Sequence, residues 1–238
     1  LALREIRSAL DAYMQAVAAQ RPYFFDHVTT LADRAMAEFH ALTGRHYRRV
    51  QTHRVEDADY LILGQGSMVS TAEAVADWLR EHRRLRVGVV NLTMFRPFPG
   101  DLLGELLKGR KGVTVLERTD QPLAEDLPLM REVRACVSKC IENGLARDGA
   151  LPYPGYAVYA KSPHIPLLYS GSFGLGSRDL QPEAIIGAVE NMLPQGAKKK
   201  FFYLSIDFVR HHPDTPKQEL HQQALLDAYP RIRELGVH

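Results

Sequence analysis

The stretch YLILGQGS, residues 60–67, decides how this chain folds. Four apolar residues of strand length run into a glycine turn, and the segment that follows, 71–83, has the apolar spacing of an amphipathic helix. The pattern recurs in the apolar runs RVGVVNL (86–92) and GVTVLE (112–117), each followed by a helical segment, 101–107 and 125–142. Strands joined by crossover helices predict a mostly parallel sheet with helices on both faces, which is a three-layer α/β fold.

The flanking sequence has a different pattern. Apolar residues spaced three or four apart before residue 45 predict helices, with a break at Arg21-Pro22 and a stop at Thr43-Gly44. Beyond an irregular stretch rich in proline and glycine, 144–165, we expect two more strands and a helix, at 165–171, 201–208 and 181–193. The end is a polar tail with one helix that Pro230 interrupts. The expected parts are a helical lead (1–48), an α/β domain (49–208) and this tail (209–238).

Composition narrows the class of protein. The 238 residues are 45% hydrophobic and 24% charged, which is typical of a globular chain. A net charge of +2 argues against a nucleic-acid partner. Apolar runs are too short for a membrane span and the start lacks the pattern of a signal peptide, so we expect a cytoplasmic protein without a membrane partner. Because the chain opens at Leu1 inside a helical pattern, we expect an excised part of something longer.

Gly64, Gly66 and Ser67 form the turn at the carboxyl end of the first strand. In an open α/β sheet this is where ligands bind, and the N–H groups that open the following helix suit an anion. The dinucleotide motif G-x-G-x-x-G is incomplete because Val69 replaces its third glycine. The alternative is a plain strand-to-helix turn capped by Ser67 or Ser70.

Two further strands end at the same edge. Pro97 and Pro99 fix the backbone around Arg96 and Phe98, so that Arg96 can face an anion or a partner carboxylate, although a turn with a solvated arginine explains the pattern equally well. Glu117 and Asp120 follow the third strand, where a mutual ion-pair network is the competing account.

A second glycine-rich turn, with Gly174 and Gly176, precedes a helix that we expect Asp179 to cap. It can cradle a phosphate, but it lacks the lysine and hydroxyl residue of a P-loop. Cys136 and Cys140, four apart on a predicted helix, suit a metal clip less well than they suit two buried thiols acting as small hydrophobes. His211-His212 has no carboxylate at ligand spacing and is interpreted as solvated.

The edge of the sheet is also a candidate interface. Six residues that combine apolar and charged types are expected to lie together and exposed at the carboxyl ends of the first three strands: Ser67, Met68, Arg96, Phe98, Glu117 and Asp120. Methionine, phenylalanine and arginine are enriched in protein interfaces. We therefore expect this edge to pack against a neighbouring domain or a second copy of the chain.

Several separated blocks together resemble one known family. They are LTGRHY (42–47), ADYLILGQGSM (58–68), VGVVNLTMFRPFP (87–99), VTVLERTDQP (113–122) and YSGSFGLGSRDLQPEAI (169–185). Over about residues 30–208 the chain is similar to the pyruvate:ferredoxin (2-oxoacid:acceptor) oxidoreductases, in their transketolase C-terminal-like domain, domain II. The resemblance implies that fold for this chain.

The resemblance also implies an enzyme that oxidatively decarboxylates a 2-oxo acid to acyl-CoA. Such an enzyme uses thiamine diphosphate with magnesium, coenzyme A and [4Fe–4S] clusters, and reduces ferredoxin or flavodoxin. This chain contains neither the G-D-G…N diphosphate motif nor a cysteine-rich cluster motif, so no catalytic residue transfers to it. We expect a non-catalytic scaffold and interface domain that binds none of these cofactors, whose partners are the other domains or subunits of a homo-oligomeric oxidoreductase.

Two alternatives stay open. One is an autonomous module that binds a small anion or nucleotide through the Gly64–Ser67 turn, Arg96 and the 171–176 turn. The other is a free-standing enzyme.

Overall fold

A computed structural model describes residues 2–147, 149–206, 214 and 216–237. The chain divides into two compact units. The first comprises residues 1–49 and 93–97, and the second comprises residues 50–92 and 98–238. His211-His212 and the end of the strand expected at 201–208 lie outside the described residues.

The first unit is helical, as the sequence predicts. Helix α1, Ala2–Tyr23, continues through Pro22 and ends one residue later. The break that the sequence predicts at Arg21-Pro22 therefore lies within two residues of the observed end. A short 3-10 turn, Phe25–His27, leads into α2, Val28–Thr43. Gly44 ends α2 with φ +73°, a left-handed conformation that glycine adopts without steric cost, and its N–H donates to the His40 carbonyl.

A six-stranded sheet forms the centre of the second unit, with strand order β1-β3-β2-β4-β5-β6. The strands are β1 Val50–His53, β2 Tyr60–Gly64, β3 Val87–Leu92, β4 Gly112–Glu117, β5 Leu168–Ser172 and β6 Phe201–Tyr203. All neighbouring pairs are parallel except β1 with β3. The prediction of a mostly parallel sheet is confirmed.

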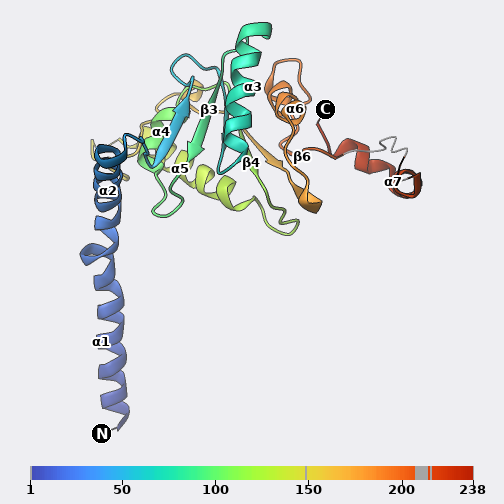
Figure 1. The fold of residues 1–238 in the computed structure, drawn as a ribbon. Helices are drawn as coiled ribbons and strands as arrows, with labels where there is room; N and C mark the ends of the chain where they lie inside the picture. The colour runs from blue at the N-terminus through green and yellow to red at the C-terminus, as the bar shows by residue number, and fades with distance from the viewer. Residues whose placement is uncertain (1, 148, 207–213, 215, 238) are drawn as a thin grey trace. The chain divides into compact units, whose positions relative to one another are not determined.

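Helices cover both faces of this sheet (Figure 1). On one face lie α3, Met68–Arg83, and α6, Pro182–Met192, and on the other lie α4, Gly100–Leu107, and α5, Pro128–Leu145. Strands β2 and β4 are buried at every residue, because helices remove both of their faces from water. This confirms the expected three layers.

Several expected elements need correction. The sequence does not predict strand β1, because its four residues, VQTH, contain no apolar run. In the structure this strand lies at the edge of the sheet, and Val50 is its one fully buried residue. Helix α3 begins at Met68, three residues earlier than expected. Asp179 does not cap α6, since the helix begins at Pro182 after Gln181.

The last described residues of the second unit pack against its sheet. Helix α7, Pro216–Ala228, is followed by a short 3-10 helix from Pro230, as the proline predicts. The Tyr203 N–H of edge strand β6 donates to the Leu235 carbonyl at 2.9 Å, and Val237 is buried in the core. Within the described residues, no helix combines the length and apolarity needed to cross a bilayer.

Candidate functional site

The carboxyl ends of β2, β4 and β5 meet at one edge of the sheet, as expected for parallel strands. Gly64 and Gly66 form the turn between β2 and α3, and Gly66 has φ +74°. The Sδ atom of Met68 lies where a side chain on Gly64 would have to be. Met68 is only 4% exposed, so the expectation that it contributes to an exposed cluster is wrong. It fills the space that glycine leaves.

Glu117, the last residue of β4, is a buried carboxylate with an internal partner. Its Oε1 accepts the Leu129 N–H at 2.6 Å and its Oε2 accepts the Met130 N–H at 3.0 Å. These donors belong to the first turn of α5, whose N-terminal dipole favours an anion. Burial raises the pKa of Glu117, while the two N–H bonds act in the opposite direction. The side chain therefore caps the N-terminus of α5 and is not available to a ligand.

Asp120 also has a partner inside the chain. Its Oδ2 accepts the Tyr203 hydroxyl at 2.9 Å, which joins the loop after β4 to edge strand β6. Burial, together with the carboxylate of Asp120, raises the pKa of the Tyr203 phenol. Beside it, the Ser172 hydroxyl donates to the Thr119 carbonyl at 2.7 Å. This part of the edge is held by its own hydrogen bonds rather than by an ion-pair network.

Arg96 and Phe98 belong to different compact units of the chain. Arg96 belongs to the first unit, where its guanidinium lies 4.2 Å from the centre of the Phe95 ring. Phe98 belongs to the second unit and is half-buried. The convergence of Arg96 with the edge residues stays a prediction.

The second glycine-rich turn contributes to a small cavity of about 160 Å³ between the start of α3 and the loop after β5. Ser67, which the sequence singled out, lines this cavity together with Arg118 and Arg178. Gly174 lies against the Arg118 side chain. Sequence reasoning did not select these two arginines. Their position was nevertheless informative, because each stands in a loop that follows a strand at the ligand-binding edge.

Cys136 and Cys140 are buried on α5, at 2% and 0% exposure, which confirms their interpretation as core residues. The Cys136 thiol donates to the Gly100 carbonyl at 3.2 Å and so joins α5 to α4. Burial raises the pKa of both thiols. Because metals bind the thiolate form, this pair is poorly suited to hold one.

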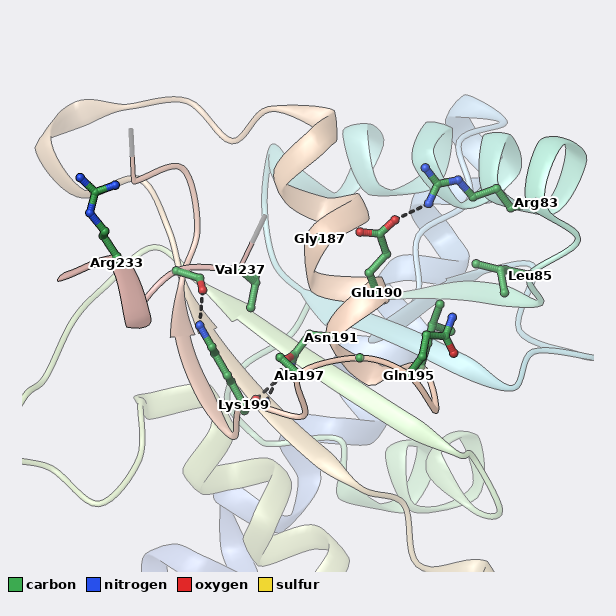
Figure 2. Close-up of a pocket in the computed structure, with 13 residues that line it drawn as sticks. Arg83, Leu85, Gly187, Glu190, Asn191, Gln195, Ala197, Lys199, Arg233 and Val237 are labelled. Carbon is green, nitrogen blue, oxygen red and sulfur yellow. Dashed lines mark hydrogen bonds and ion pairs between the residues drawn. The ribbon is translucent and has the colours of Figure 1, made fainter. Parts of the chain in front are cut away.

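A larger cavity, of about 690 Å³, lies at the opposite edge of the sheet (Figure 2). The segments that precede β3 and β6 line it, together with the ends of α3 and α6. Arg83 and Lys199, two of the cations in its lining, already have partners. Arg83 pairs with Glu190, and the Lys199 ammonium donates to the Gly236 carbonyl at 2.6 Å (Figure 2). The same ammonium donates to the Glu234 carbonyl at 2.6 Å. Two helix C-termini also make this place unfavourable for an anion.

Comparison with known proteins identifies the part of the chain that contains β2, β3 and β4. Residues 58–147, which run from just before β2 to just after α5, match the family model described as pyruvate:ferredoxin oxidoreductase core domain II. They belong to this family. The core domain II match covers the turn at Gly64–Ser67, the segment around Arg96, and both Glu117 and Asp120.

Curated relatives of core domain II extend the similarity beyond the matched residues. Pyruvate synthase subunit PorA of Thermotoga maritima is 35% identical over 181 residues, which are 72% of this chain and 40% of that protein. A probable pyruvate-flavodoxin oxidoreductase of Escherichia coli is 28% identical over 195 residues, 80% of this chain and 15% of that protein. The chain therefore spans less than half the length of these relatives.

A solved structure was also found, that of 2-oxoglutarate:ferredoxin oxidoreductase from Magnetococcus marinus with 2-oxoglutarate, coenzyme A and succinyl-CoA bound. It matches 65% of this chain and 21% of that chain, with 18% identity and a TM-score of 0.41.

The residues in hand do not fit the metal cofactors that the family implies. A [4Fe–4S] cluster takes four thiolates, whereas the two cysteines here are buried and their pKa values are raised. Across the described ranges, no group of three histidine, cysteine, aspartate or glutamate side chains is placed to hold a metal ion such as the magnesium of thiamine diphosphate. No step of a reaction is assigned to these groups in this chain.

Proposed function

We propose that this chain serves as the core domain II part of a larger 2-oxoacid:acceptor oxidoreductase. In that enzyme it packs against the parts that bind thiamine diphosphate and the iron–sulfur clusters, and it binds neither itself. The observation that carries the proposal is the match of residues 58–147 to core domain II, together with the 35% identity to a pyruvate synthase subunit. The whole enzyme would oxidise a 2-oxo acid to acyl-CoA and reduce ferredoxin or flavodoxin.

The chemistry of the edge supports a structural role. Catalysis by acid–base chemistry needs a titratable side chain within reach of a substrate. Glu117 instead closes the start of α5, and Asp120 accepts a hydrogen bond from Tyr203. The two carboxylates that the sequence placed at this edge therefore stabilise the domain.

Calorimetric titration of thiamine diphosphate into the 238-residue chain, with and without magnesium, tests this proposal. We expect no magnesium-dependent binding to the chain, and clear binding to the complete oxidoreductase as the positive control. Saturable, magnesium-dependent binding to the chain alone would show that the cofactor site lies here and would overturn the proposal.

The interface role rests on Arg96 and Phe98. We propose that they contact a neighbouring domain or a second copy of the chain in the assembled enzyme. Analytical ultracentrifugation of the parent enzyme carrying both Arg96→Ala and Phe98→Ala tests this. We expect weaker assembly, by about 1–3 kcal/mol if Arg96 forms a buried charge-assisted hydrogen bond. Unchanged assembly would remove these two residues from the interface.

A further inference from the structure

The small cavity beside α3 gathers hydrogen-bond donors that have no partner among the residues that the structure describes. Its lining includes Ser67 and Thr71, whose side chains carry hydroxyl groups, and Arg118, whose side chain carries a guanidinium. Ser67 occupies the N-cap position of α3, but its side chain makes no capping bond. Within the described ranges, none of these three side chains makes a hydrogen bond or an ion pair. Their donors are therefore available to a ligand.

The position of Arg118 is built into the fold. Gly174, at φ +72°, lies so close that a Cβ atom there would be 2.7 Å from both Cγ and Nε of Arg118. Only glycine leaves this space, so the stem of the arginine rests against the turn after β5. Buried Met68 and Phe173 supply apolar surface to the same lining. An arginine whose stem is held in one place is suited to bind a compact anion through its planar, multiply donating guanidinium.

The charge of the lining also favours an anion. Among the described residues, its lining has the cations Arg118 and Arg178 and one carboxylate, that of exposed Asp179. A volume of about 160 Å³ admits one phosphate group but not a whole nucleotide. Any larger ligand must therefore extend out of this cavity.

A second cavity, of about 310 Å³, offers that extension. Arg178 lines both cavities and so marks where they adjoin. The second is largely apolar, with Leu175, Leu204 and Leu225 in its lining. Its lining also includes Ser205, whose Oγ is buried and has no hydrogen-bond partner in the described part of the chain. Buried hydroxyls are nearly always hydrogen-bonded in folded proteins, so this unsatisfied group is a further sign that a polar group of a ligand belongs here.

We propose that the two cavities together bind a phosphate monoester of a small organic molecule. The phosphate is held by Arg118 with the hydroxyls of Ser67 and Thr71, and the organic body lies in the second cavity beside Leu225 and the Ser205 hydroxyl. This site differs from the anion module expected from the sequence, because Arg118 replaces Arg96 as the cation. It does not depend on the chain being part of an oxidoreductase.

The test uses inorganic phosphate and phenyl phosphate as probes of the 238-residue chain, titrated calorimetrically at constant ionic strength and without magnesium. Omitting magnesium separates the result from the titration with thiamine diphosphate. We expect saturable binding of both probes, with phenyl phosphate binding about tenfold more tightly because its ring occupies the second cavity. Arg118→Met should weaken both by about tenfold or more, because it removes the charge-assisted hydrogen bonds. Leu225→Ala should weaken phenyl phosphate alone.

Arg84→Met is the matched control. Arg84 is an exposed arginine at the opposite end of α3. Its substitution therefore removes the same charge at a place away from the cavity. We expect its affinities to stay within about twofold of the unmodified chain, as additivity predicts for distant sites. Arg118→Lys, which keeps the charge but loses the planar fork, should give an intermediate affinity.

The proposal fails if inorganic phosphate shows no saturable binding, or if Arg118→Met and Arg84→Met have equal effects. It also fails if phenyl phosphate binds no more tightly than phosphate, because the second cavity would then take no part.

Discussion

At the scale of single residues, the edge of the sheet contains side chains with quite different tasks. Glu117 is bonded to the start of a helix, whereas Arg118, the next residue along the chain, reaches the small cavity. Successive residues leaving a strand point to opposite faces, which explains how neighbours acquire separate roles.

Glu117→Gln should lower the free energy of unfolding by about 1–3 kcal/mol, because an amide accepts only one of the two N–H bonds and its NH₂ group opposes the other donor. Urea denaturation of the chain measures this. Glu125→Gln is the matched control, since Glu125 is exposed on the loop before α5. Equal stability of the two variants would show that the bonds to Leu129 and Met130 contribute nothing.

Gly174→Ala should have two effects. The left-handed backbone costs an alanine about 1–2 kcal/mol, and its Cβ displaces Arg118. Gly109→Ala is the control for the first effect, because Gly109 has φ +74° and a Cβ atom there would lie 3.9 Å from the Pro163 carbonyl oxygen, which is ordinary van der Waals contact. We expect both variants to lose stability in thermal unfolding but only Gly174→Ala to weaken phosphate binding. Normal phosphate affinity in Gly174→Ala would argue against a positioned Arg118.

At the scale of elements, the Asn143 side chain makes several of the hydrogen bonds that fasten the irregular segment after α5 to that helix. The Asn143 amide accepts the Tyr153 N–H at 2.9 Å and donates to the carbonyls of Tyr153 and Tyr156 at 2.9 and 3.1 Å. A proline-rich and glycine-rich stretch without regular structure can be ordered in this way, because its backbone groups find partners outside a helix or sheet.

Asn143→Ala should therefore loosen this segment and lower the free energy of unfolding by about 1–3 kcal/mol, since it leaves buried backbone groups unpaired. Limited proteolysis should show faster cleavage between residues 150 and 160. Glu142→Ala, at an exposed position on the same helix, is the control. Equal cleavage rates for both variants would mean that other contacts order the segment.

At the scale of the whole chain, the last residues complete the sheet. Strand β6 is an edge, and its Tyr203 N–H is covered by the Leu235 carbonyl while Lys199 binds the Glu234 and Gly236 carbonyls. Exposed edge strands invite association with other chains, so this cover protects the molecule.

Lys199→Met should release residues 234–237 from the edge. We expect faster hydrogen exchange at the Tyr203 amide, by about tenfold if the two bonds together contribute roughly 1.4 kcal/mol. Lys161→Met, at an exposed lysine on the segment before β5, is the control. Unchanged exchange at Tyr203 would show that the two Lys199 bonds are not needed to hold the segment in place.

The sequence by itself determined the architecture, because apolar runs of strand length alternate with amphipathic segments between residues 60 and 145 and that periodicity admits little besides a mostly parallel, three-layer sheet. The family resemblance also followed from the sequence, and residues 58–147 bear it out. The sequence did not predict the short strand β1, since four residues at the edge of a sheet leave no apolar pattern that marks a strand. Only the tertiary structure decided which polar side chains have hydrogen-bond partners inside the molecule. The partners of Glu117 and Asp120 come from α5 and β6, and Gly174 approaches Arg118 from another strand's loop. Periodicity records which face of an element is buried, but hydrogen-bond partners distant in sequence are set by how the elements pack.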